Sequence, residues 1–132
     1  MIVLDASAAL PLLVDTWPLS DGVRRALREV GGALCAPHLL DLEMAQVLGR
    51  LAGRGEVTAH VAGRALADLA ALRLTRYPHD LLLPRVWSLR ENVTAYDAAY
   101  LALAETLDAT LVTRDRALAD VPGSDADVLV LA

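Results

Sequence analysis

The chain has 132 residues, of which 55% are hydrophobic, and its formal net charge is −5. This length suits one compact domain over residues 1–132. The acidic balance excludes a general nucleic-acid coat protein, the single cysteine excludes an internal disulfide, and no apolar run reaches the roughly 18 residues of a membrane helix. The N-terminus also lacks the basic region of a signal peptide. We therefore expect a cytoplasmic protein with no membrane association.

Short apolar runs alternate with longer stretches of helical pattern along the chain. The runs have the length and the β-branched content of buried strands, and the longer stretches repeat their apolar residues at helical spacing between caps and glycines. In chain order, the predicted elements are a strand at 2–4, a helix at 20–31, a strand at 33–37, helices at 38–55 and 58–72, a strand at 73–78, helices at 80–90 and 92–105, a strand at 110–113, a helical turn at 114–120, a loop at 121–127 and a strand at 128–131.

The order of these elements predicts the fold class. Strands that alternate with helices are typical of an α/β domain around a parallel sheet. The strands are continuous apolar runs, which indicates that helices cover both faces of the sheet. We therefore expect a short parallel sheet flanked by helices.

Four carboxylates are predicted to face one crevice of this fold. Asp5 directly follows the first strand, and Asp115 follows the strand at 110–113. Function in open α/β sheets gathers at the carboxyl ends of the strands. Glu43 and Asp97 lie near the starts of two helices that can face the same crevice.

The setting of Asp97 is unusual for a charged residue. At helical spacing it shares a mostly apolar face with Tyr100, Leu101 and Ala104, and a buried charge normally has a partner. Converging carboxylates repel one another and raise each other's pKa values, and a divalent cation removes that cost. Oxygen-only ligation selects Mg²⁺ or Mn²⁺, and such ions activate water in phosphoryl displacements.

Four motifs, in this order and spacing, resemble the PIN-domain nucleases and, more specifically, the VapC toxins of bacterial toxin–antitoxin pairs. They are "IVLDASAAL", "PHLLDLEMAQVL", "NVTAYDAAYLALAE" and "LVTRDRAL". The resemblance covers nearly the whole chain. It implies a PIN-like three-layer fold and a Mg²⁺- or Mn²⁺-dependent endoribonuclease that leaves a 5′-phosphate and a 3′-hydroxyl. It also implies a homodimer that is silenced by a small VapB-like antitoxin.

The resemblance assigns the four carboxylates Asp5, Glu43, Asp97 and Asp115 to a catalytic metal site. Asp5 and Asp97 are the expected direct ligands. Glu43 is expected to bind through water or to orient the nucleophile, and Asp115 to bind directly or through water. Some members of the family have another acid shortly after the fourth-motif aspartate, where this chain has arginine and alanine. A second metal position is therefore in question.

Other side chains are expected to support this site. Ser7 and Thr113 each have a hydroxyl two residues from a proposed ligand, and can hydrogen-bond a carboxylate or a metal-bound water. Arg114 and Arg116 flank the site and are candidates to hold the RNA backbone. Arginines 50, 85 and 90 are more remote candidates. An apolar groove for an antitoxin helix is expected around Leu12, Leu13, Trp17 and the helix from Val57 to Leu72.

Two other functions are weighed against the nuclease. A receiver domain or an aspartyl-phosphate phosphatase also places an aspartate at a strand end, but both normally use a lysine, and the chain has none. A catalytically weak or inactive PIN domain could act as an RNA- or protein-binding module. All four motif acids are present, and this favours the enzyme.

Overall fold

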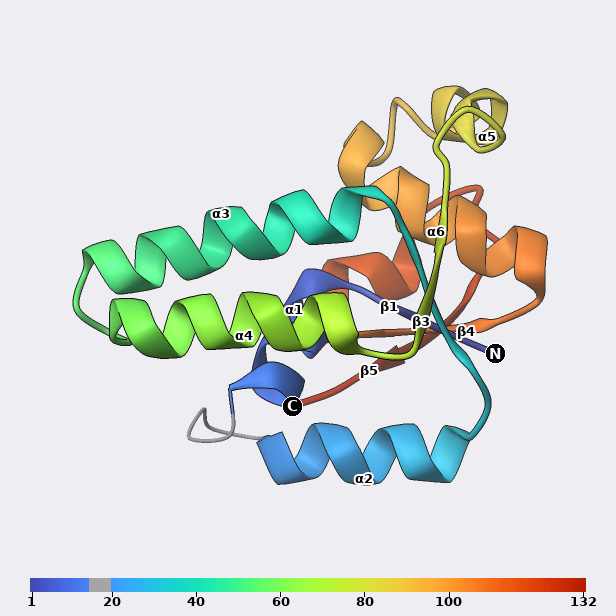
Figure 1. Cartoon of the computed structure of the whole chain (residues 1–132). Coiled ribbons are helices and arrows are strands. Elements are labelled where there is room, and N and C mark those ends of the chain that lie inside the picture. Colours follow the sequence, from blue (N-terminus) through green and yellow to red (C-terminus); the bar gives the residue numbers. More distant parts are fainter. Residues whose placement is uncertain (15–19) are drawn as a thin grey trace.

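The computed structural model describes residues 1–14 and 20–132. Five parallel strands form one sheet in the order β3-β2-β1-β4-β5 (Figure 1). The strands are β1 (Ile2–Leu4), β2 (Leu34–Pro37), β3 (Leu74–Tyr77), β4 (Thr110–Thr113) and β5 (Asp127–Val130). The predicted α/β class and the parallel sheet are both confirmed.

Helices cover both faces of the sheet, as the apolar strands predicted. The helices are α1 (Ala6–Leu13), α2 (Ser20–Val30), α3 (Leu39–Gly53), α4 (Ala59–Ala71), α5 (Leu83–Ser88), α6 (Ala95–Leu107) and the 3-10 helix η1 (Arg116–Asp120). One core lies under α1, α3 and α4, and a second lies under α5, α6 and η1. The helices α3 and α4 run side by side as a hairpin (Figure 1). The result is the expected three-layer domain.

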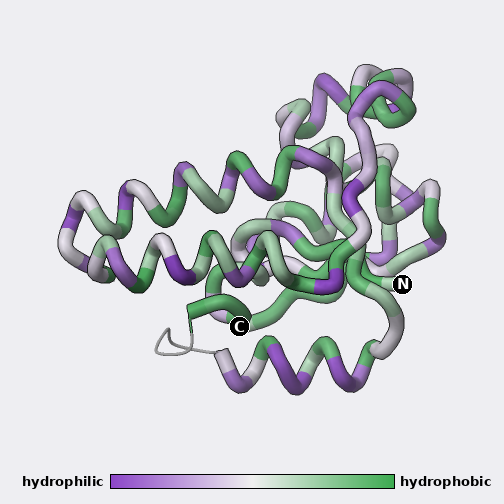
Figure 2. The backbone as a smooth tube through the Cα atoms, in the orientation of Figure 1, coloured by the Kyte–Doolittle hydropathy of each residue, from purple (hydrophilic) through white to green (hydrophobic). Residues whose placement is uncertain are grey.

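The central strand β1 contributes to both cores. Ile2 and Leu4 are buried on the α1 side, and Val3 is buried on the α6 side. Alternation of this kind follows from the two-residue period of a strand. The α2 helix, by contrast, has mixed hydropathy along its length (Figure 2), with Val23 buried and Arg25 exposed. The sheet and α6 therefore carry the core, and α2 lies at the surface.

The strand order also locates the crevice. The chain runs outward from β1 to β3 on one side, and then returns to place β4 on the other side of β1. Leu4 pairs with Val112 at the carboxyl ends of β1 and β4. This point, where the strand order reverses, is where ligands bind in open α/β sheets. Asp5 and Asp115 follow these two strands.

Two local features differ from the prediction. The helix α1 was not predicted, because Pro11 lies inside it and a proline in a helix interior is disfavoured. The α5 helix is shorter than the predicted stretch at 80–90 and begins beside a proline. Among the residues described, no helix has the length and apolar character needed to cross a membrane.

Candidate active site

Asp5 is the most deeply placed of the predicted site acids. It is only 7% exposed and caps the N-terminus of α1, where its Oδ1 accepts the backbone N–H of Ala8 at 3.1 Å. Ser7 Oγ donates to Oδ1 at 2.7 Å, and Thr113 Oγ1 donates to Oδ2 at 2.5 Å. Burial nevertheless raises the pKa of Asp5, and only part of this effect is offset by the three hydrogen bonds.

The two hydroxyls join the ends of β1 and β4. Ser7 Oγ accepts the backbone N–H of Arg114 at 2.8 Å, and Thr113 Oγ1 accepts that of Asp115 at 3.0 Å. Ser7 and Thr113 were predicted to contact a site carboxylate, and in the structure both contact Asp5. A metal-supporting role for them remains a prediction.

Asp97 lies in the first turn of α6. Thr94 caps this helix by accepting the backbone N–H of Asp97 at 3.2 Å. The Asp97 side chain is half-buried. Its pKa is raised by burial first, and then by the charges of Asp115 and Asp5. The partly buried setting inferred from the sequence is therefore present. Within the described residues, no cationic side chain lowers the pKa of Asp97.

Glu43 lies in the second turn of α3 and is half-buried. Burial raises its pKa, and the charges of Asp97 and Asp5 raise it further. The hydroxyl of Tyr100 donates to Glu43 Oε1 at 2.5 Å. This tyrosine was not singled out from the sequence, because the two residues are 57 positions apart and only the folded structure brings them into contact.

Asp115 differs from the other three acids because it is exposed. Its Oδ1 accepts the backbone N–H of Ala117 at 3.0 Å and so caps η1. Its charge still raises the pKa values of Asp5 and Asp97. Asp115 is therefore within electrostatic range of the buried pair but keeps its carboxylate near solvent.

The four acids form one electrostatic group and not a closed metal cage. Asp5, Glu43 and Asp97 each have a raised pKa with at least one other site acid among the causes. No ion pair between residues of the described ranges includes any of the four. No three histidine, cysteine, aspartate or glutamate side chains within these ranges are already arranged to hold a metal ion. The donors are all oxygens, which are the ligands that hard divalent cations bind in proteins.

Two contacts fix the helix that carries Glu43. Arg76 on β3 makes a bidentate ion pair with Asp41 at 2.7 and 3.0 Å. The imidazole Nε2 of His79 accepts the backbone N–H of Leu39 at 2.9 Å, which satisfies a free donor at the start of α3. Asp41 and His79 therefore hold α3 in place and are not part of the acid group.

The arginines near the site fall into two groups. Arg50 lines a hollow of about 350 Å³ together with Glu43 and Ala6, and Arg116 is exposed just after Asp115. Arg114 is half-buried, and its Nε donates to the carbonyl of Ala132 at 3.3 Å. These three remain candidates for RNA contact.

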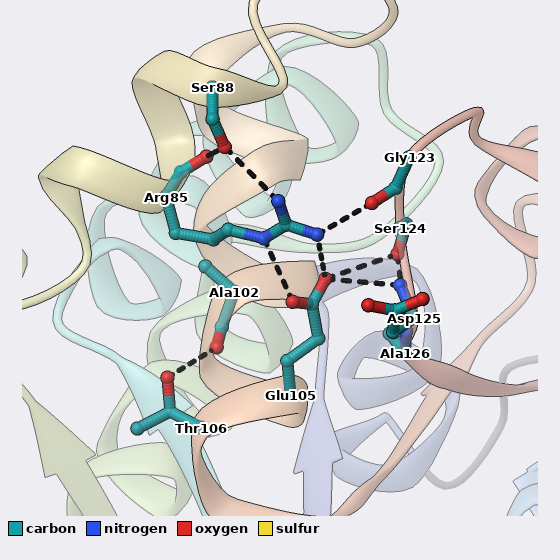
Figure 3. Close-up of polar contacts among 9 residues, drawn as sticks. All are labelled: Arg85, Ser88, Ala102, Glu105, Thr106, Gly123, Ser124, Asp125 and Ala126. Carbon is teal, nitrogen blue, oxygen red and sulfur yellow. Dashed lines mark hydrogen bonds and ion pairs between the residues drawn. The ribbon is translucent and has the colours of Figure 1, made fainter.

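Two more remote candidates have other partners. Arg85 donates to both carboxylate oxygens of Glu105, at 2.9 and 3.3 Å, and to the carbonyl of Gly123 (Figure 3). The guanidinium of Arg90 lies 4.5 Å from the centre of the Trp87 ring. Arg85 therefore serves the packing of α5 against α6 and is not a free cation for RNA.

The sequence of the chain was compared with protein families and with known proteins. A model of the PIN domain matches residues 2–124. The chain belongs to the PIN-domain family. Ribonuclease VapC9 of Mycobacterium tuberculosis is 44% identical to this PIN domain over 131 residues, which are 99% of this chain and 98% of VapC9. Ribonuclease VapC1 of the same organism is 39% identical and covers 96% of this chain and 94% of its own.

Solved structures share the fold of this PIN domain. PAE2754 from Pyrobaculum aerophilum superimposes with a TM-score of 0.67 and 26% identity, over 96% of this chain and 81% of that one. VapC20 of M. tuberculosis, described as a sarcin-ricin loop cleaving toxin, has a TM-score of 0.71 and 13% identity, over 90% and 93% of the two chains. At this lower identity the likeness concerns the fold.

Proposed function

We propose that this PIN domain is the toxin of a VapBC-type toxin–antitoxin pair and acts as an endoribonuclease that hydrolyses RNA phosphodiesters. The single observation that carries the proposal is the arrangement of three desolvated carboxylates, Asp5, Glu43 and Asp97, at the switch point of the sheet with no cationic side chain paired to them in the described ranges. The relatives named VapC ribonucleases, at up to 44% identity, support the same function.

Mg²⁺ or Mn²⁺ fits the donor set of this site. Ribonucleases of this family generally depend on divalent metal ions, and the carboxylates here are hard oxygen donors whose mutual repulsion a cation would relieve. Asp5 and Asp97 would bind the ion directly, and Glu43 and Asp115 directly or through water. When bound, the ion activates a water molecule and neutralises charge on the phosphoryl oxygens.

Side chains of the protein would orient the Asp5 carboxylate and the attacking water around this ion. Ser7 and Thr113 hold both oxygens of Asp5, so this carboxylate has one fixed direction. Glu43 uses Oε1 to accept from Tyr100, and its Oε2 is the atom that would accept a hydrogen bond from the attacking water. In-line attack on phosphorus then leaves a 5′-phosphate and a 3′-hydroxyl, as the family resemblance implies.

The RNA backbone needs positive charge beside the acids. Arg50 lines the hollow that Glu43 also lines, and Arg116 is exposed after Asp115. With the half-buried Arg114, these residues would hold the phosphates on either side of the cleaved bond. The overall charge of −5 makes non-specific affinity for RNA weak, so the shape of a structured target would supply the specificity.

The antitoxin would bind on the α1–α4 side of the molecule. A hollow of about 260 Å³ between these helices is lined by residues that include Leu13, Val61 and Arg64. Leu13 and Val61 belong to the groove expected from the sequence, and Trp17 lies outside the described residues. Structural neighbours include VapBC2 from Rickettsia felis bound to a promoter DNA fragment and a VapBC complex from Salmonella typhimurium. The homodimer implied by the resemblance remains part of the proposal.

The experiment is a cleavage assay on the protein purified without antitoxin. Total RNA should be cut in Mg²⁺ or Mn²⁺ and left intact in EDTA. Asp97→Asn should lower the rate at least about 100-fold, since outer-shell contacts to a metal ligand are already worth 10–100-fold. The matched control is Asp21→Asn, which changes an aspartate whose side chain is 96% exposed on α2.

Two results would contradict the proposal. Cleavage that persists in EDTA or in Asp97→Asn excludes a metal site at these acids. RNA or protein binding with no cleavage and no growth arrest on expression identifies a binding module instead. Circular dichroism of Asp97→Asn shows whether the fold is retained, because an unfolded variant would mean that Asp97 is structural.

A further inference from the structure

Tyr100 is the largest fully buried side chain near the acid group, and it has a polar atom to satisfy. It is 2% exposed on α6, and its hydroxyl donates to Glu43 Oε1 at 2.5 Å. A buried tyrosine hydroxyl normally finds a partner, but any backbone carbonyl would serve. Here the partner is a half-buried carboxylate of the proposed site, on a different helix.

The spacing on α6 links this hydroxyl to the site. Asp97 and Tyr100 are three residues apart, so they share one face of the helix. One turn of α6 therefore presents a carboxylate toward the crevice and a donor toward the carboxylate of α3. The same charges of Asp97 and Asp5 that raise the pKa of Glu43 also repel its side chain.

A glutamate repelled in this way has an alternative position. Its side chain has three rotatable bonds, and Glu43 lies on a half-exposed part of α3, so rotation toward solvent would separate it from the other acids. The Tyr100 hydroxyl opposes this rotation, because a hydrogen bond to a charged acceptor is stronger than one between two neutral groups. The tyrosine ring is itself fixed by the core around α6.

We propose that Tyr100 is a positioning residue that holds the carboxylate of Glu43 in the active site, against the repulsion of Asp5 and Asp97. The inference rests on the proposed nuclease function and names a residue that acts through Glu43. It predicts that Oε1 is committed to Tyr100, and that Oε2 remains available for the cation or the attacking water. Loss of the hydroxyl should then weaken the contribution of Glu43 and leave the fold intact.

The test is a double-mutant cycle between Tyr100→Phe and Glu43→Ala. Tyr100→Phe keeps the ring and removes only the hydroxyl. At saturating Mn²⁺ it should lower kcat about 10- to 100-fold with little change in KM for RNA. The concentration of Mn²⁺ for half-saturation, measured by electron paramagnetic resonance without RNA, should shift in the same direction in both single variants. In the Glu43→Ala background, Tyr100→Phe should have no further effect on either quantity.

The control and the contrary outcomes are distinct. Tyr77→Phe removes the hydroxyl of a half-buried tyrosine on β3 whose side chain hydrogen-bonds Cys35, and it should behave as wild type. Additive losses in the cycle, or a Tyr100→Phe variant equal to wild type in kcat and Mn²⁺ binding, overturn the inference while the nuclease function stands. Failure of the proposed function gives a different result: the Asp97→Asn variant would then bind Mn²⁺ as tightly as the wild type does.

Discussion

Two regions of this molecule place carboxylates out of water, and they do so in opposite ways. Glu105, whose side chain is 16% exposed, is paired with a cation: Arg85 donates to both of its carboxylate oxygens, and Ser124 and the backbone N–H of Asp125 donate to Oε1 (Figure 3). Around Asp5, Glu43 and Asp97, the donors are neutral hydroxyls and amides, and the charges that shift the pKa values of these acids are other carboxylates.

This difference in partners distinguishes a structural ion pair from a candidate metal site. The Arg85–Glu105 pair is complete within the chain, so it holds α5 and the loop at 122–126 against α6 and requires nothing further. The pKa values of Asp5, Glu43 and Asp97 are raised first by burial and then by the charges of neighbouring carboxylates. Uncompensated buried charge is destabilising, and it is found where a bound ion supplies the missing charge. Substitutions in the ion pair and in the acid group should therefore change stability in opposite directions.

The largest expected effect on stability comes from breaking the complete pair. Arg85→Ala leaves the Glu105 carboxylate buried without its counterion and should lower the free energy of unfolding by about 2–3 kcal/mol. This is less than the 3–5 kcal/mol of fully buried pairs, because Arg85 is itself 36% exposed. Urea denaturation measures the change. Arg64→Ala breaks the exposed pair with Asp68 and should cost about 0.5 kcal/mol or less; equal losses in the two variants would contradict the comparison.

A smaller effect, with the opposite sign, is expected in the acid group. Because burial raises the pKa of Asp97, the folded protein binds more protons than the unfolded chain above the ordinary carboxyl pKa of 3.8. As the pH rises through this raised pKa, the free energy of unfolding of the metal-free protein should therefore fall. Asp97→Asn removes the penalty, so the variant should be more stable than wild type in EDTA at neutral pH and equal to it in acid.

Added Mg²⁺ should reverse this order at neutral pH. A cation that binds only the folded wild type stabilises it by about 2.7 kcal/mol at one hundred times its dissociation constant, and the variant should respond much less. Urea denaturation of both proteins from acidic to neutral pH, with EDTA or with Mg²⁺, provides the four curves. A metal-free Asp97→Asn that is less stable than wild type at neutral pH would show that the carboxylate is satisfied within the protein.

The smallest effect concerns the support of the site. His79→Ala removes the acceptor for the backbone N–H of Leu39 at the start of α3 and should lower the free energy of unfolding by about 0.5–1 kcal/mol. His60→Ala, which removes an exposed imidazole from α4, is the matched control and should change it little. A His79→Ala variant as stable as this control would mean that the cap contributes nothing to α3.

Much of the fold could be predicted because each local signal agrees with the tertiary structure. The strand at 2–4 has the predicted bounds, and α4 and α6 begin close to the predicted starts, with Thr58 and Thr94 as their side-chain caps. The acids were placed at one edge of the sheet because parallel strands share their carboxyl ends. The electrostatic coupling among them agrees with this placement. Their catalytic role stays a prediction.

What was missed depends on partners far apart in the sequence. Arg85 was a candidate for RNA contact because its ion pair with Glu105, 20 residues away, has no local signature. Tyr100 was counted among the apolar residues that surround Asp97, because a tyrosine on a helix face indicates packing unless the partner of its hydroxyl is known. Side-chain partners on different helices, such as Tyr100 and Glu43, depend on how the helices are placed in the fold, and the periodicity of the sequence does not give that placement.

The order of the strands has a consequence for how the protein is made. Asp5 is at the start of the chain, and the Thr113 hydroxyl that holds its Oδ2 comes 108 residues later. Every strand pair is parallel, so each pairing closes a long loop, and non-local pairings form slowly. A growing chain therefore has its first-motif aspartate long before it has the strand that orients it. For an enzyme that cuts RNA, the fold itself delays activity until β4 and Thr113 have been synthesised.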